Sequence, residues 1–271
     1  MHEARFDERG SVIRWTEAAG DGPAVVFVHG LGAASTVYHA HIAARPELAG
    51  RRILFVDLPG HGISDRPHDF DYSLESHADA LAAALDAAGV RGGVIAGHSM
   101  GGSVAIVLAH RRPDLVGRLV VTEGNLDPFP PPAAGSSGIA SYTEEEFVRG
   151  DGGGGFARVL ERVGPTWAAT MRLADPVALY RSAAHLRRGT DPVMREMFVH
   201  ARVPRVYLQG ELSGDLPGAD GLRAAGVDVV TVPGAGHNIM FDNPDAFTES
   251  VAAQAHAAGP STAPSAAGRA V

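Results

Sequence analysis

Short apolar runs recur along the chain and alternate with stretches of helical periodicity. A polar turn at residues 7–10 precedes the alternating segment 11–16 (SVIRWT), which predicts one arm of an N-terminal hairpin. Strands separated by helices predict a mostly parallel sheet that is covered on both faces. The apolar runs that predict buried strands are residues 24–28, 53–56, 93–96, 119–121, 203–208 and 227–232.

Helical spacing of apolar residues is visible between several of these runs. Residues 74–88 carry apolar side chains on one helical face, and Gly89 follows as a stop signal. Residues 100–110 begin directly after a predicted strand, and residues 245–257 form the last periodic segment. We therefore expect at least three helices to pack on the sheet.

The alternation of strands and helices breaks between residues 125 and 202. This stretch contains a Pro-rich segment at 128–132, a glycine run at 152–155 and two or three amphipathic stretches without strand signals. We interpret residues 125–202 as a helical cap inserted into a core that comprises residues 1–124 and 203–258.

Composition and charge narrow the classes of function. The formal net charge of −8 and the absence of a Lys/Arg-rich run disfavour a nucleic-acid partner. The chain has no cysteine, which excludes disulfides, Cys-ligated zinc and a Cys nucleophile. Residues 1–20 are charged throughout and no long apolar run follows, so we expect a cytoplasmic protein that does not enter a membrane. Residues 259–271 lack periodicity and predict a disordered tail, and the Ala/Gly/Arg-rich composition is typical of a bacterial enzyme.

A candidate nucleophile lies in the sequence GHSMGG at residues 97–102. This segment joins a predicted strand to a predicted helix, and a GxSxG turn in that context lifts the serine hydroxyl clear of the backbone. Gly97 and Gly101 are small because a Cβ at either position would crowd such a turn. The pattern predicts Ser99 as a nucleophile.

A glycine-containing loop, HGLG at residues 29–32, follows the first buried strand. Its backbone can approach the site closely, so we expect the Leu31 N–H to donate to a developing oxyanion. The Met100 N–H at the start of the next predicted helix would be the second donor. Each such donor is worth on the order of 3 kcal/mol in a transition state.

Four motifs together resemble one superfamily: HGLG at 29–32, DLPGHGISD at 57–65, GHSMGG at 97–102 and PGAGH at 233–237. The chain resembles the α/β-hydrolases, in particular the esterase and non-haem haloperoxidase branch with its dehalogenase and epoxide-hydrolase relatives. The resemblance covers nearly the whole chain outside the cap. It implies an α/β-hydrolase fold: an eight-stranded, mostly parallel sheet with an antiparallel strand at its start and helices on both faces. Ser99 at the nucleophile position, where dehalogenases and epoxide hydrolases carry Asp, argues against their chemistry.

The candidate general base is His237, which follows an apolar run and therefore lies at the carboxyl end of a strand. His29 and His98 flank the other motifs, and we expect them to pack or donate hydrogen bonds beneath the site. The remaining histidines show no metal-ligand spacing, so we predict no metal and no cofactor.

The acid of the predicted triad has two candidates. The common pattern of the superfamily would place it three residues after Gly210, where this chain has Ser213, and Asp215 follows nearby. A minority branch carries the acid at the end of the strand that follows the nucleophile helix, and Glu123 occupies that position. We predict Glu123 as the acid and keep Asp215 as the alternative, since either can work if its carboxylate reaches the imidazole Nδ1.

These residues predict a serine hydrolase that cleaves a carboxylic ester, lactone or thioester of a small organic molecule through an acyl-enzyme. One alternative is a carbon–carbon bond hydrolase or a cofactor-free perhydrolase with the same triad. An alternative of another class is a non-hydrolytic ligand-binding protein on the same scaffold. The sequence also allows the protein to form a homodimer. Several apolar side chains of the cap are candidates to line a pocket, and we expect most of them to pack on the core instead. They are Phe129, Phe147, Trp167, Met171, Tyr180, Met194 and Phe198.

Overall fold

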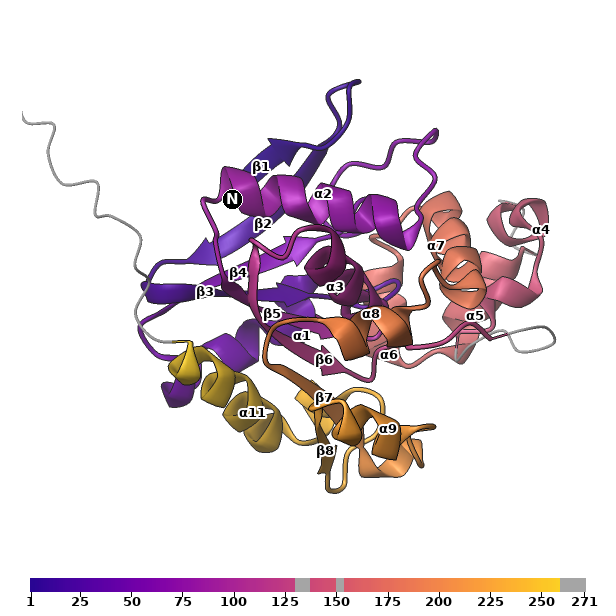
Figure 1. The fold of residues 1–271 in the computed structure, drawn as a ribbon. Coiled ribbons are helices and arrows are strands. Elements are labelled where there is room, and N and C mark those ends of the chain that lie inside the picture. The colour runs from indigo at the N-terminus through magenta and orange to yellow at the C-terminus, as the bar shows by residue number, and fades with distance from the viewer. Residues whose placement is uncertain (130–136, 150–153, 259–271) are drawn as a thin grey trace, which may run out of the picture.

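A mostly parallel sheet forms the centre of the molecule in the computed structural model, which describes residues 1–129, 137–149 and 154–258 (Figure 1). The six strands that lie side by side in the order β4-β3-β5-β6-β7-β8 all pair in parallel. β2 pairs antiparallel with both β1 and β4, so β2 is the strand that runs opposite to the others, although the resemblance implied an antiparallel first strand. In spatial order, the eight strands among the described residues are β1 (His2–Arg5), β2 (Val12–Ala18), β4 (Arg51–Asp57), β3 (Asp21–Val28), β5 (Gly93–His98), β6 (Val116–Thr122), β7 (Arg205–Gly210) and β8 (Asp228–Val232).

The parallel strands β3 to β7 are mostly buried, which explains why they are apolar runs in the sequence, whereas β8 at the sheet edge is only partly buried. In β3, Val26 and Val28 belong to the hydrophobic cluster on one face of the sheet. Val25 and Phe27 alternate with them and belong to the cluster on the other face. Each predicted strand coincides with an observed one, so the expectation of a mostly parallel, doubly covered sheet is confirmed.

Helices cover the two faces of this sheet (Figure 1). α2 (Leu74–Ala87) and α3 (Met100–Arg111) pack together on one face, and α1 (Ser35–Ala43) and α11 (Pro244–Ala257) pack on the other. α2 begins where the Ser73 side chain accepts a hydrogen bond from the Ser76 N–H, and Gly89 follows its end with φ 65°. The shorter core elements are η1 (Pro46–Leu48), η3 (Glu211–Ser213), α9 (Ala219–Ala224) and α10 (Ile239–Asp242).

Between β6 and β7 the described part of the chain contains helices and no strand. We refer to residues 125–202 as the helical insertion. The predicted Pro-rich segment and glycine run lie partly, and the predicted tail wholly, outside the described residues. No helix in the described ranges is long and apolar enough to span a membrane. The helices of the insertion are η2 (Ile139–Ser141), α4 (Glu144–Val148), α5 (Gly155–Arg162), α6 (Pro165–Met171), α7 (Pro176–Arg188) and α8 (Met194–His200).

Five histidines are buried in the core: His29, His39, His61, His77 and His98. Burial disfavours the charged imidazolium and lowers the pKa of His29 to about 4 and those of His39 and His61 to about 3. The pKa values of His77 and His98 also fall well below the usual 6.5 for the same reason. All five side chains are therefore neutral in the folded protein at neutral pH.

The free energy of unfolding should fall as the pH drops below 6.5. These histidines become protonated in the unfolded chain but stay neutral in the folded protein, because burial lowers their pKa values. Each histidine contributes up to about 1.4 kcal/mol per pH unit, and the loss continues down to the folded-state pKa. Urea unfolding between about pH 7 and pH 5 would measure it, and we expect a total loss of several kcal/mol. His39→Phe, which keeps the stacking on Phe27, should lower the slope by one proton, whereas an unchanged slope would contradict this account.

Candidate active site

The Ser99 backbone forms a strained turn between β5 and α3. Its φ is 52° and its ψ is −120°, a conformation that L-residues rarely adopt. A Cβ on Gly97 would collide with the Gly101 carbonyl, and a Cβ on Gly101 would collide with the carbonyls of Val28 and His29. The turn thus requires both glycines, and it presents the serine side chain at the carboxyl end of β5.

Glu123 reaches the same edge of the sheet from β6. β5 and β6 pair in register, with His98 opposite Thr122, so Ser99 and Glu123 each follow a strand that ends at the same level. Glu123 also has a φ of 52°. The Ser99 N–H donates to the Thr122 carbonyl at 2.8 Å and the Glu123 N–H to the Leu208 carbonyl at 3.0 Å, which fixes both turns to neighbouring strands.

The Glu123 carboxylate contacts both neighbouring segments. Oε1 accepts a hydrogen bond from the Gly210 N–H at 2.6 Å, and Oε2 lies 3.3 Å from His237 Nδ1. The Glu123 side chain is 8% exposed and that of His237 is 40% exposed. The carboxylate is therefore sheltered and held in place, while the imidazole is partly open to solvent.

The loop that carries His237 follows β8 and is held by three groups from other segments. The Gly234 N–H donates to Glu211 Oε2 at 2.8 Å, and the Gly236 N–H donates to Asp242 Oδ2 at 2.9 Å. Neutral His98 donates from Nε2 to the His237 carbonyl at 2.9 Å. Sequence reasoning missed Glu211 and Asp242, because their partners are backbone groups that no motif identifies.

Asp215, the alternative acid, is exposed and borders the cavity together with Ser213. Among the described residues, its carboxylate makes no hydrogen bond or ion pair with His237. The structure brings His237 together with Glu123 and not with Asp215.

The HGLG loop passes beside Ser99 and is held by a buried histidine. His29 Nδ1–H donates to the Gly30 carbonyl at 2.7 Å, and His29 Nε2 accepts from the Leu58 N–H at 2.9 Å. This pattern needs a neutral ring, in agreement with a pKa lowered by burial. Within the described ranges the N–H groups of Leu31 and Met100 have no acceptor in the protein, so both are available to a ligand.

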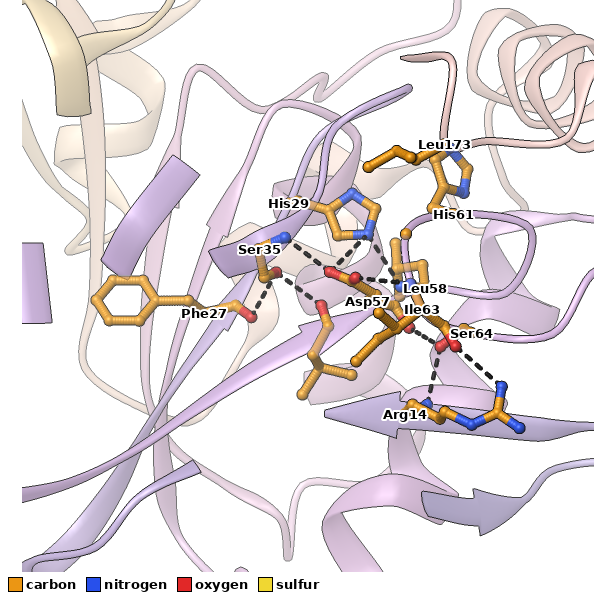
Figure 2. Close-up of polar contacts among 12 residues, drawn as sticks. Arg14, Phe27, His29, Ser35, Asp57, Leu58, His61, Ile63, Ser64 and Leu173 are labelled. Carbon is orange, nitrogen blue, oxygen red and sulfur yellow. Dashed lines mark hydrogen bonds and ion pairs between the residues drawn. The ribbon is translucent and has the colours of Figure 1, made fainter. Parts of the chain in front are cut away.

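The buried Asp57 carboxylate links the HGLG loop region to the loop after β4 (Figure 2). Oδ1 accepts from the Ser35 N–H at 2.7 Å, which satisfies a donor at the start of α1, and Oδ2 accepts from the Ile63 N–H at 3.0 Å. His29 Nε2 lies 3.9 Å from Oδ1. Burial raises the pKa of Asp57, so these donors must compensate for a desolvated charge.

Serine hydroxyls extend this network to the strand ends (Figure 2). Ser35 Oγ lies within hydrogen-bond distance of the carbonyls of Phe27 and Val56, at 3.1 and 2.7 Å. Ser64 Oγ donates to the Asp57 carbonyl and accepts from the Arg14 N–H. The ends of β3 and β4, and hence the position of the HGLG loop, depend on these contacts.

A cavity of about 470 Å³ opens at Ser99, Glu123 and His237. The helical insertion contributes part of its wall, including Phe129 and Trp167 from the predicted set. The rest of that set does not border this cavity. No hydrogen bond joins the Ser99 and His237 side chains in the described part of the chain, a separation that is common before substrate binds.

No group of three or more His, Asp or Glu side chains among the described residues is placed to hold a metal ion. Within those residues one arginine, Arg195, and no lysine borders the cavity. Its guanidinium binds Asp127 through contacts of 2.6 to 3.1 Å. Its charge is therefore already compensated.

Comparison with known proteins gives matches over parts of the chain. The chain is 44% identical over 101 residues to an sn-1-specific diacylglycerol lipase of Mus musculus, covering 37% of this chain and 32% of that protein. It is 33% identical over 184 residues to an esterase of Mycobacterium tuberculosis, covering 66% of this chain and 54% of the relative. The chain thus spans about a third to about a half of the length of these two relatives.

The order of the strands in the sheet, the strained turn at Ser99 and the contact between His237 and Glu123 are together typical of the α/β-hydrolase fold. A structural match supports this assignment: an esterase from Exiguobacterium antarcticum superposes with a TM-score of 0.77 at 20% identity, over 94% of this chain and 100% of that one. A family model described as the alpha/beta hydrolase fold matches residues 23–146. The chain has the α/β-hydrolase fold, as its motifs predicted, and parts of it are similar to the lipase and the esterase named above.

Asp57→Ala should destabilise the protein by about 3 kcal/mol, because it leaves the N–H groups of Ser35 and Ile63 without acceptors. Urea unfolding at neutral pH measures the loss. Asp57→Asn is the matched control: it keeps one acceptor oxygen and the volume, and should cost less. A loss below about 0.5 kcal/mol for Asp57→Ala would show that the network does not support the fold.

Proposed function

We propose that this protein is a serine hydrolase that cleaves a carboxylic ester of a small organic molecule, with lactones and thioesters as close variants. Ser99 is the nucleophile, His237 the general base and Glu123 the acid. The observation that carries the proposal is the 3.3 Å contact between His237 Nδ1 and Glu123 Oε2, because it orients the imidazole at the cavity that Ser99 also borders.

The reaction follows from these positions. His237 Nε2 accepts the Ser99 hydroxyl proton as Oγ attacks the substrate carbonyl, and Glu123 stabilises the resulting imidazolium. The N–H groups of Leu31 and Met100 donate to the oxyanion. His237 then returns the proton to the leaving alcohol as the C–O bond breaks, and water hydrolyses the acyl-enzyme by the same steps.

The surroundings of the cavity favour an uncharged substrate. A carboxylate-bearing substrate would need a cationic partner, and the one arginine that borders the cavity among the described residues, Arg195, already binds Asp127. Asp215, which makes no ion pair with another described residue, also borders the cavity and adds negative potential. We further propose that residues 125–202 act as a cap that shapes the cavity, because Phe129 and Trp167 contribute to its wall.

Treatment with a fluorophosphonate should add one adduct to the wild-type protein and none to Ser99→Ala, because covalent capture requires an activated serine. Intact mass spectrometry measures the adduct. Ser103→Ala, on the buried part of α3, is the matched control and should still be labelled. A folded wild type without an adduct would refute the mechanism and favour a non-hydrolytic ligand-binding protein.

Glu123→Gln should lower kcat by about 10³- to 10⁴-fold, because an amide cannot stabilise the imidazolium or hold its tautomer. Asp215→Asn, the control at the alternative position, should change kcat by less than about threefold. Steady-state hydrolysis of p-nitrophenyl acetate, with circular dichroism to verify folding, compares the two. The reverse ranking would assign the acid role to Asp215.

A further inference from the structure

A second, smaller cavity meets the first at Ser99. Its volume is about 150 Å³, against about 470 Å³ for the larger one. The nucleophile therefore lies between two spaces of different size. The residues that border both are Leu31, Ser99, Trp167 and His237.

Trp167 is fixed at this junction by contacts with the HGLG loop. Its indole Nε1–H donates to the Leu31 carbonyl at 2.8 Å. The fit is close on the other side as well: a Cβ on Gly32 would lie 3.0 Å from Trp167 Nε1 and 3.1 Å from Met171 Cε. The ring is therefore a wall with a defined position, although α6, which carries it, belongs to the helical insertion.

The other walls of the small cavity are equally constrained. Tyr38 is 3% exposed, and its ring centroid lies 5.1 Å from that of Phe241 and 6.0 Å from that of His98. His98 is held in turn by its hydrogen bond to the His237 carbonyl. Setting aside the proposed base His237, the described side chains that line this cavity are uncharged at neutral pH, because burial keeps His98 neutral and the others are not charged groups. The space is thus small, rigid and suited to an uncharged group.

We propose that Trp167 is a specificity-determining residue that confines one of the two moieties of the ester, acyl or alcohol, to the small cavity. This inference rests on the proposed hydrolase function. A cavity of about 150 Å³ accommodates a group the size of benzene, so the confined moiety has up to about six non-hydrogen atoms. The larger, more polar moiety occupies the other cavity, where Asn125, Gln209 and Ser213 are among the bordering side chains.

Two substrate series that both start at methyl acetate test the inference: methyl esters of straight-chain acids, and acetates of straight-chain alcohols. In wild type, kcat/KM should fall at least about 10-fold in one series once the chain exceeds about six non-hydrogen atoms. Trp167→Ala should shift that limit to longer chains and raise the long-to-short ratio of kcat/KM by at least about 10-fold. A limit in the acid series places the acyl group in the small cavity, and a limit in the alcohol series places the alcohol there.

Trp167→Phe is the matched control, because it keeps a flat ring but removes the hydrogen bond to Leu31, and it should retain the wild-type limit. Trp167→Leu, which also opens the wall, is the second variant should the alanine variant not fold. Equal losses for all chain lengths in the Phe and Leu variants would mean that Trp167 only supports the loop, and would overturn the inference. Fluorophosphonate labelling separates the two failures: a labelled wild type without a length limit refutes only this inference, whereas an unlabelled one refutes the proposed hydrolase.

Discussion

The in-register pairing of β5 with β6 is the constraint on which the site depends. It places Ser99 and Glu123 at the ends of adjacent strands, each in a left-handed conformation that costs on the order of 1–3 kcal/mol. Such strain persists only where neighbouring structure enforces it. Here the enforcing contacts are backbone hydrogen bonds to the next strand, so the sheet itself holds both side chains toward the His237 loop.

A second requirement is that the buried histidines beside the site stay uncharged. The hydrogen bonds of His29 need a neutral ring, because its Nε2 accepts from the Leu58 N–H, and burial keeps His98, which donates to the His237 carbonyl, neutral as well. A charged imidazole at either position would also oppose the positive charge that His237 would gain in the proposed proton transfer. Burial by apolar strands and helices therefore serves the chemistry as well as the stability of the core.

The sequence predicted the strands, the main helices and the candidate positions Ser99, Glu123 and His237 because each depends on local pattern or on a motif. The acid stayed ambiguous, since the choice between Glu123 and Asp215 requires the distance between strands that are remote in sequence. The anchoring roles of Asp57, Glu211 and Asp242 were not predictable for the same reason: their partners are backbone N–H groups brought close only by folding. The position of Trp167 between the two cavities was not predictable either, because it depends on the contact of α6 with the HGLG loop.

His237 contacts Glu123, which directly follows β6, and not a residue of the segment after β7. The segment after β7 borders the large cavity through Ser213, Asp215 and Leu216, yet none of these side chains holds the imidazole among the described contacts. Mutations there can remodel the entrance while the histidine–carboxylate pair stays intact. If the proposed mechanism holds, substrate range and proton transfer depend on separate segments of this chain, and natural or laboratory selection can alter the first without rebuilding the second.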